Sequence, residues 1–255
     1  MHSKKITVMI QARTGSSRLP SKVLTKIENE PMIWHVINRA KKIKSVQQIT
    51  LITTRNKNDK ILLKIAKDNG IIGFSGDAHD VLNRHYQCAL RYDADPIIRI
   101  TSDCPLIDPN VVEEILQFYL THDYDYVSNT IIPTYPDGLD TEIFSFTALK
   151  RCVMNAKWNS EREHVTPYMK NNPEKFKIFN YENKKDLSRF RWTVDEKRDL
   201  QFVRAIYSKM KPKTIFSMQE ILKIISKNPN LLKINNDIIR NEGYFKSLKN
   251  DRRVK

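Results

Sequence analysis

Short apolar runs rich in β-branched residues alternate with amphipathic segments through the first half of the chain. The β-rich runs occupy residues 6–12, 47–54, 71–76, 96–103 and 123–129. The segments between them carry apolar side chains at helical spacing over residues 31–43, 58–70, 79–92 and 109–120. This alternation predicts an α/β fold, with a mostly parallel sheet covered by helices on both faces.

The second half departs from that rhythm. Residues 134–146 predict a turn into an extended segment, and residues 175–181 and 189–195 predict strands. Helices are expected at residues 145–156, 160–172, 197–210 and 217–228, the second kinked or restarted at Pro167. We predict one α/β domain over residues 1–211, with a smaller irregular lobe at about 130–185. Residues 212–255 form a C-terminal helix and a basic tail, for which disorder after Leu248 is the default.

Size and cysteine content indicate one sizeable core in a reducing compartment. The chain has 255 residues, of which 40% are hydrophobic. Cys88, Cys104 and Cys152 lie far apart with no CxxC pair, which disfavours a disulfide framework or a zinc site. No apolar stretch approaches the roughly 18–20 residues that span a bilayer, and the start lacks an export signal. We therefore expect a soluble, cytoplasmic protein with no membrane partner.

The net charge of +15 raises the possibility of nucleic-acid binding. The 44 Lys and Arg residues are, however, spread along the chain and accompany no RNA-binding signature or zinc finger. An AT-rich genome would also encode this wealth of Lys, Ile and Asn. We expect a basic surface that attracts anionic small molecules, and no nucleic-acid partner.

The loop after the first predicted strand is rich in cations and small residues. It contains Arg13, Thr14, Gly15, Ser16, Ser17, Arg18 and Lys22. Backbone N–H groups and hydroxyls at its small residues can bind phosphate oxygens, and the cations can neutralise their charge. The loop matches neither GxxxxGK[ST] nor GxGxxG, so a merely solvated surface loop is the alternative.

Asp103 ends the predicted strand at residues 96–103, where a carboxylate is exposed above the sheet. A Mg²⁺ ion that bridges phosphates needs such an oxygen ligand. Asp108 is the next candidate, although it precedes Pro109 and is equally suited to cap a helix. Cys104 is expected to be a small packing residue.

Asp195 ends the predicted strand at residues 189–195 and is the expected partner of Asp103 in holding a metal. Its position also suits a cap for the helix that follows. Asp199 lies one turn further on and is expected to be structural.

A polar cluster in the irregular lobe suits recognition of a small hydroxylated or phosphorylated acceptor. Its residues are Asp137, Gly138, Asp140 and Glu142, with Arg162 and His164 nearby in sequence. His164 is a candidate general base, although a lone histidine near a helical proline is also a common structural residue.

Seven stretches in order over about residues 6–248 together resemble the SpsF-type family of spore coat and surface polysaccharide cytidylyltransferases. They are IQARTGSSRLPSKVL, SGDAHDVLNRHYQCA, RITSDCPLIDP, YPDGLDTEIFSFTAL, EREHVTPY, RWTVDEKRDL and NEGYFKSL. Acylneuraminate and 3-deoxy-manno-octulosonate cytidylyltransferases are related to that family. The resemblance implies a Rossmann-like nucleotidyltransferase fold and transfer of CMP from CTP, with release of pyrophosphate and a requirement for Mg²⁺ or Mn²⁺.

The resemblance also implies roles for particular residues. Arg18, Lys22, Asp103 and Asp195 are the expected catalytic residues, with the two aspartates holding the metal. The expected nucleotide-binding residues are Gln11, Ala12, Arg13, Thr14, Gly15, Ser16, Ser17, Arg18, Lys22, Asp80, Arg84 and Ser102. The expected acceptor-binding residues are Asp137, Gly138, Asp140, Glu142, Arg162 and His164.

The expected reaction is attack of an acceptor oxygen on the α-phosphorus of CTP, for capsule or other surface polysaccharide synthesis. A phosphate-ester acceptor needs no general base, whereas a sugar hydroxyl needs His164 or a metal-bound water. The sequence leaves the choice between a sugar acid and a phosphorylated acceptor open.

Two other functions remain as alternatives. A metal-dependent glycosyltransferase using a sugar nucleotide would share the sheet, but typically carries a DxD pair where this chain has SDCP. A basic nucleic-acid-binding or regulatory protein with a degenerate site would bind oligonucleotides without turnover. The resemblance implies a homodimer formed through the irregular lobe, while the sequence itself leaves the oligomeric state open.

Overall fold

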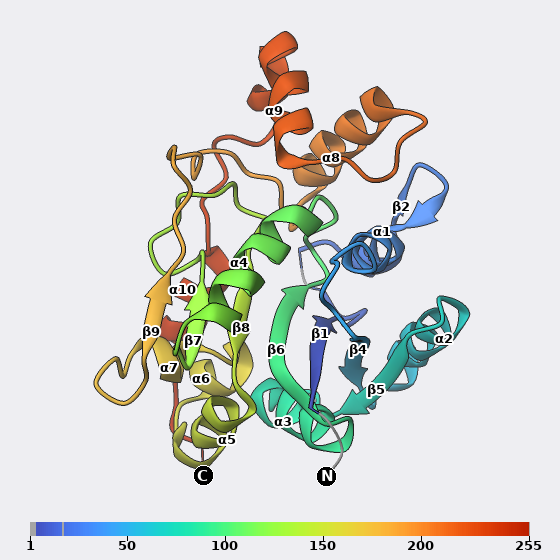
Figure 1. Cartoon of the computed structure of the whole chain (residues 1–255). Helices are drawn as coiled ribbons and strands as arrows, with labels where there is room; N and C mark the ends of the chain where they lie inside the picture. The colour runs from blue at the N-terminus through green and yellow to red at the C-terminus, as the bar shows by residue number, and fades with distance from the viewer. Residues whose placement is uncertain (1–3, 17, 255) are drawn as a thin grey trace.

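A seven-stranded mixed sheet forms the centre of the protein. The computed structural model describes residues 4–16 and 18–254. The strand order is β5 (Ile72–Gly76), β4 (Gln48–Thr54), β1 (Lys5–Gln11), β6 (Ala94–Thr101), β8 (Glu142–Phe144), β7 (Tyr126–Ser128) and β9 (Ile178–Asn180), from right to left in Figure 1. The first four strands in this order are parallel, and β8 is antiparallel to both of its neighbours. The predicted α/β fold with a mostly parallel sheet is therefore confirmed.

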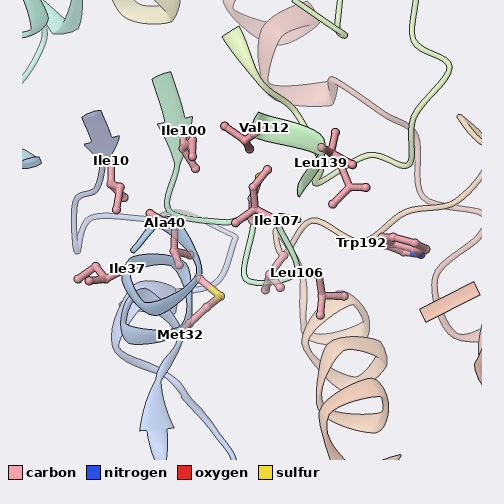
Figure 2. Close-up of a cluster of buried hydrophobic side chains, with 14 of the residues drawn as sticks. Ile10, Met32, Ile37, Ala40, Ile100, Leu106, Ile107, Val112, Leu139 and Trp192 are labelled. Carbon is pink, nitrogen blue, oxygen red and sulfur yellow. The ribbon is translucent and has the colours of Figure 1, made fainter. Parts of the chain in front are cut away.

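Helices cover both faces of this sheet. The larger core lies between the sheet and α1 (Met32–Ala40), α2 (Lys60–Asp68), α4 (Pro109–Thr121) and α8 (Lys197–Met210). Figure 2 shows part of it, where Ile10 and Ile100 of adjacent strands lie near Ala40 of α1. The smaller core lies under α3 (Val81–Arg91), α5 (Phe146–Asn155) and α7 (Pro167–Lys170).

Smaller sheets, 3₁₀ turns and further helices complete the described part of the chain. A two-stranded sheet pairs β2 (Lys26–Ile27) with β3 (Glu30–Pro31), and the described residues also form the 3₁₀ turns η1 (Lys22–Leu24), η2 (Lys57–Asp59) and η3 (Pro229–Ile234). The other helices are α6 (Asn159–His164), α9 (Met218–Lys227) and α10 (Glu242–Lys249). None of the helices in the described part of the chain is both long and apolar enough to span a bilayer.

Polar side chains fix where the helices begin. Asp108 accepts from the backbone N–H of Asn110 at 2.9 Å and so caps α4. Its other oxygen accepts from the N–H of Met218 at 2.6 Å, which ties the start of α9 to α4. Of the two roles considered for Asp108, the structure shows the cap. Likewise, Glu196 and not Asp195 stands at the N-cap of α8.

The prediction of a strand at residues 189–195 is wrong. This fully described segment starts in a turn at Arg189 and bends at Asp195, and between them it pairs only through an isolated bridge between Arg191 and Asp137. The N–H of Trp192 donates to the carbonyl of Asp137 at 2.6 Å within this bridge, and the N–H of Val194 donates to the carbonyl of Asp103, which lies outside any strand, at 2.8 Å. The alternation of apolar side chains arises because Trp192 and Val194 enter the core beside the sheet.

Two further expectations for the second half are corrected. The single helix expected over residues 160–172 is divided into α6 and α7 at Val165, whose φ of 74° is incompatible with helix. The tail after Leu248, for which disorder was the default, is ordered against α6. The N–H of Asn159 donates to the carbonyl of Arg252 at 2.9 Å, and that of Val254 donates to Lys157 at 2.7 Å.

Gly138→Ala should destabilise the fold, because Gly138 has a φ of +106° and lies where two loops cross. An added Cβ would be 2.6 Å from the backbone N of Thr193 and 2.7 Å from the carbonyl carbon of Trp192. We expect a loss of more than about 1 kcal/mol in the free energy of unfolding, measured by urea denaturation. Gly15→Ala is the control, since nothing lies within 4 Å of its Cβ position. Equal stability of the two variants would contradict the strained crossing.

Candidate active site

A cavity of about 540 Å³ lies at the carboxyl ends of β1 and β6. Twelve sequence-predicted residues line it: Gln11, Ala12, Arg13, Gly15, Ser16, Arg18, Lys22, Arg84, Ser102, Asp103, His164 and Asp195. Val81, Thr101, Glu163, Glu242, Gly243 and Lys246 complete the lining. This cavity lies where the strand-end rule places ligand sites in such a sheet. Ser17, also predicted to bind nucleotide, lies outside the described residues.

Lys22 connects three distant segments at the floor of this cavity. Its Nζ lies 3.1 Å from Oδ2 of Asp103 and 2.8 Å from Oδ1 of Asp195, and it donates to the carbonyl of Val194 at 2.8 Å. Burial acts to lower the pKa of Lys22, but the two carboxylates raise it above its ordinary value. Burial likewise acts to raise the pKa of Asp103, but Lys22 and a hydrogen bond from Thr101 hold it at about 2. The site therefore presents a charged amine between two aspartates, of which Asp103 is firmly ionised.

Arg18 extends this charge cluster toward the opening of the cavity. Its Nη2 lies 2.9 Å from Oδ1 of Asp195, and its Nη1 donates to Oε2 of Glu242 at 2.8 Å. Arg13 lies 4.0 Å from Glu163. The three cations that the sequence assigned to a phosphate-binding loop thus all face the cavity and contact carboxylates.

Asp59 anchors the loop and was missed by the sequence reasoning. One of its oxygens accepts from the backbone N–H of Thr14 at 2.7 Å and from the Thr14 hydroxyl at 2.6 Å. The other oxygen accepts from the hydroxyl of Thr54. Burial acts to raise the pKa of Asp59, but these hydrogen bonds lower it overall. Asp59 follows shortly after β4, so the strand-end rule, extended to the second strand, could have found it.

Arg191 lies beneath the two aspartates and holds Asp195 in place. Its guanidinium contacts Asp137 at 3.0 Å, Asp195 at 3.2 Å and Asp199 at 2.9 Å. Asp199 is fully buried and also accepts from Asn235, which agrees with the structural role expected for it. Burial and the nearby charge of Asp140 raise the pKa of Asp137 to about 7.

A second cavity, of about 410 Å³, adjoins the first. Asp80 and Arg162 both line it, and their side chains form an ion pair at 3.0 Å. Arg84, which is only 2% exposed, donates to the carbonyl of Asp77 at 2.6 Å. Burial and the charge of Arg13 lower the pKa of Arg84 to about 10. The segment from Asp77 to Arg84, which contains the predicted nucleotide-binding residues Asp80 and Arg84, thus forms a wall beside the loop that follows β1.

Four predicted acceptor residues lie outside the lining of both cavities, as far as the described residues show. They are Asp137, Gly138, Asp140 and Glu142. Asp140 contacts Arg240 at 2.7 Å. Glu142 is 5% exposed and accepts from Tyr126 at 2.7 Å and from Thr166 at 2.5 Å. These contacts give the four residues structural roles behind the cavity, whereas Arg162 and His164 line the cavities themselves.

His164 reaches the cavity from α6 and is held by α10. Its Nε2 lies 3.0 Å from Oγ of Ser247, which itself donates to Glu163 at 3.0 Å. Because the serine proton points to the carboxylate, Nε2 carries the imidazole hydrogen and Nδ1 is the acceptor nitrogen. Burial lowers the pKa of His164 below its ordinary value, so the ring is neutral at pH 7.

Asp103 and Asp195 are suited to hold a divalent cation. Their oxygens already converge on one positively charged atom, the Nζ of Lys22. Within the described residues no group of three or more His, Cys, Asp or Glu forms a complete metal cage. Two carboxylates without further protein ligands fit Mg²⁺, which commonly binds to one or two carboxylates and completes its shell with phosphate oxygens and water.

Comparison with known proteins gives consistent matches over almost the whole chain. The family model described as Cytidylyltransferase matches residues 7–241. An uncharacterized protein of Methanocaldococcus jannaschii, MJ1063, is 35% identical over 92% of this chain and 96% of its own length. The spore coat polysaccharide biosynthesis protein SpsF of Bacillus subtilis is 27% identical over 88% of this chain and 95% of its own. The solved structure of a cytidylyltransferase from Leptospira borgpetersenii superposes with a TM-score of 0.88 and 33% identity, covering 93% of this chain and 99% of that one.

Glu142→Gln should lower stability in a pH-dependent way. Burial acts to raise the pKa of Glu142, but Lys170, Arg99 and two hydroxyl donors lower it overall. The ionised group therefore contributes stability above its unfolded pKa of about 4.3, and this contribution is lost as the pH falls. We expect a loss of roughly 3 kcal/mol in the free energy of unfolding at pH 7, and a smaller loss below about pH 4. Chemical denaturation across this pH range measures both.

The matched control is Glu174→Gln, since the side chain of Glu174 is 65% exposed and its ion pair with Lys175 is at the surface. This variant should unfold like the wild type at every pH. A difference between wild type and Glu142→Gln that stays constant with pH would contradict the buried ion pair.

Proposed function

The chain belongs to the cytidylyltransferase family, and we propose that it transfers CMP from CTP to an anionic small-molecule acceptor, releasing pyrophosphate. The acceptor is a sugar acid or a phosphorylated small molecule. The product serves capsule or other surface polysaccharide synthesis, a role supported by the similarity to SpsF. The observation that carries the proposal is Lys22, which lies between Asp103 and Asp195 at the end of a phosphate-binding loop.

The loop and the wall beside it form the proposed CTP site. Arg13, Arg18 and Lys22 supply positive charge for the triphosphate, and the N–H groups near Gly15 supply hydrogen bonds. Arg18 and Lys22 now contact carboxylates, which a phosphate can replace as acceptors. The nucleoside would lie along the segment from Asp77 to Arg84, in the adjoining cavity.

Asp103 and Asp195 would hold Mg²⁺ or Mn²⁺ in the active enzyme. When bound, the ion supplies charge neutralisation of the phosphate oxygens. The protein's own residues do the rest: Arg191 orients Asp195, and Lys22 fixes both carboxylates relative to the loop. Arg18 and Lys22 then stabilise the charge that develops on the departing pyrophosphate.

The acceptor oxygen attacks the α-phosphorus from the α6 side of the cavity. For a hydroxyl acceptor, Nδ1 of the neutral His164 is the proposed proton acceptor, since Nε2 is engaged with Ser247. An acceptor that is already a phosphate oxyanion would need no base. We further propose that the enzyme is a cytoplasmic homodimer formed through the irregular lobe, where β9 is the edge strand of the sheet.

Asp103→Asn should abolish catalysis, since the amide cannot supply a charged ligand to a cation or balance Lys22. Pyrophosphate release would be measured with Mg²⁺ from each of CTP, UTP, ATP and GTP, against a panel of acidic sugars and phosphorylated small molecules. We expect release with CTP and one acceptor, reduced more than about 100-fold in Asp103→Asn.

The control for this assay is Asp68→Asn, at an exposed aspartate on the far end of α2, which should keep full activity. Absence of turnover with every pair, together with no thermal shift on adding CTP, would contradict the proposed function.

Asp59→Asn should weaken CTP binding without removing a group that contacts CTP. The amide lacks the charge that holds the N–H and hydroxyl of Thr14, so the loop loses its anchor. We expect the Kd for CTP, measured by isothermal titration calorimetry, to rise roughly tenfold. The Asp68→Asn control should bind CTP like the wild type. An unchanged Kd in Asp59→Asn would mean that other contacts hold the loop, and it would contradict this prediction.

A further inference from the structure

Helix α10 meets the loop after β1 at the active-site cavity, although the two segments lie at opposite ends of the chain (Figure 1). Glu242 of the helix accepts a hydrogen bond from Nη1 of Arg18 at 2.8 Å. The backbone of Gly243 is close as well, since a Cβ added to this glycine would lie 3.9 Å from Nη2 of the same arginine. One face of α10 therefore lies against Arg18.

Lys246 belongs to this same face of α10. It follows Glu242 by four residues and Gly243 by three, and residues at these spacings are neighbours on a helix surface. All three residues line the cavity. The exposed side chain of Lys246 is thus part of the wall that meets the arginine of the loop.

Other side chains of α10 hold the helix against α6. Ser247 donates to Glu163 at 3.0 Å and lies 3.0 Å from Nε2 of His164. The ring of Tyr244 meets the ring of His164 edge-on, at 5.0 Å between centroids. These contacts fix the orientation of the helix without Lys246, which leaves its amine available to a ligand in the cavity.

Lys246 lacks the carboxylate partner that each cation of the loop has. Arg13, Arg18 and Lys22 each lie within 4.0 Å of a carboxylate. Among the described residues the Lys246 amine has neither an ion pair nor a hydrogen bond, because Glu242, which has the spacing to pair with it, contacts Arg18. The described lining carries five cationic side chains and four carboxylates, so Lys246 leaves the cavity with an excess of positive charge.

The cavity becomes more exposed from its floor toward α10. The side chain of Lys22 is 12% exposed, that of Arg18 is 34% exposed and that of Glu242 is 58% exposed. In the proposed reaction the α-phosphate lies at the floor, where Asp103 and Asp195 would hold the metal. The adjoining cavity, to which the nucleoside is assigned, is lined neither by Arg18 nor by any described residue of α10. The more exposed end beside Arg18 is therefore left for the β- and γ-phosphates.

We propose that Lys246 binds the β- and γ-phosphates of CTP together with Arg18. This inference rests on the proposed function and adds to the triphosphate site a cation from the C-terminal helix. An ammonium without a counter-charge attracts a phosphate oxyanion and forms a charge-assisted hydrogen bond with it. Because these two phosphates leave as pyrophosphate, Lys246 contributes to binding of CTP and not to binding of CMP.

The test compares CTP, CDP and CMP, which share the base and the ribose and differ only in their phosphates. Isothermal titration calorimetry with Mg²⁺ and no acceptor gives the Kd of CTP for wild type, Lys246→Met and Lys246→Arg, and displacement of CTP gives those of CDP and CMP. Lys249→Met is the matched control, because it removes one charge from an exposed position on the same helix, outside the cavity lining of the described residues.

We expect the Kd of CTP to rise at least about tenfold in Lys246→Met, the effect of losing one charge-assisted hydrogen bond. The Kd of CDP should rise less and that of CMP should not change. Lys246→Arg and Lys249→Met should bind CTP nearly as the wild type does.

Three results would overturn the inference. The first is an unchanged Kd of CTP in Lys246→Met, and the second is an equal loss of affinity for CTP and CMP, which would place Lys246 away from the β- and γ-phosphates. The third is an equal loss in Lys249→Met, which would show only an effect of net charge. Failure of the wild type to bind CTP would instead refute the proposed function.

Discussion

The amine of Lys22 joins three parts of the chain that are far apart in sequence. It follows the loop after β1, contacts Asp103 after β6, and contacts Asp195 just before α8. A largely buried ammonium without counter-charges would be costly, so each of these segments is constrained by the other two. The buried guanidinium of Arg191 is likewise surrounded by carboxylates: it contacts the second oxygen of Asp195 and also Asp137 and Asp199. The position of the cavity floor follows from these two cations.

The sequence was sufficient for the sheet, most helices and the edge of the sheet where the site lies, because those depend on local periodicity. The carboxyl ends of parallel strands meet at one edge, so the loop after β1 and Asp103 after β6 could be placed together. The extended segment around Arg191 resembled a strand because alternation records only which side chains are buried. It does not record whether the backbone donors pair with a neighbouring strand or, as here, with Asp137 and Asp103.

Residues whose roles depend on distant contacts were harder to assign. Asp59 anchors Thr14 across 45 residues of sequence. Its place shortly after β4 is a signal for the site, but the same place also suits an aspartate that caps the following helix. Glu142 belongs to a polar stretch that suggested acceptor binding, yet Arg99 and Thr166 enclose its carboxylate. Composition alone made the C-terminal residues resemble a basic disordered tail. Their order comes from specific partners on α6, such as Ser160 for Asp251.

The pairing of charges in the cavity also explains how a basic site can be held ready before a polyphosphate binds. Arg18 and Lys22 would repel each other if they were unpaired, and the loop would spread into solvent. Carboxylates of the protein keep both side chains pointing into the cavity. A phosphate that enters can therefore replace a carboxylate as the partner of these cations, whose side chains are already in position. The exchange frees Glu242 from Arg18, while Ser247 and Tyr244 still hold α10 against His164. The position of α10 therefore depends on its contacts with α6 more than on the pairing of Glu242 with Arg18.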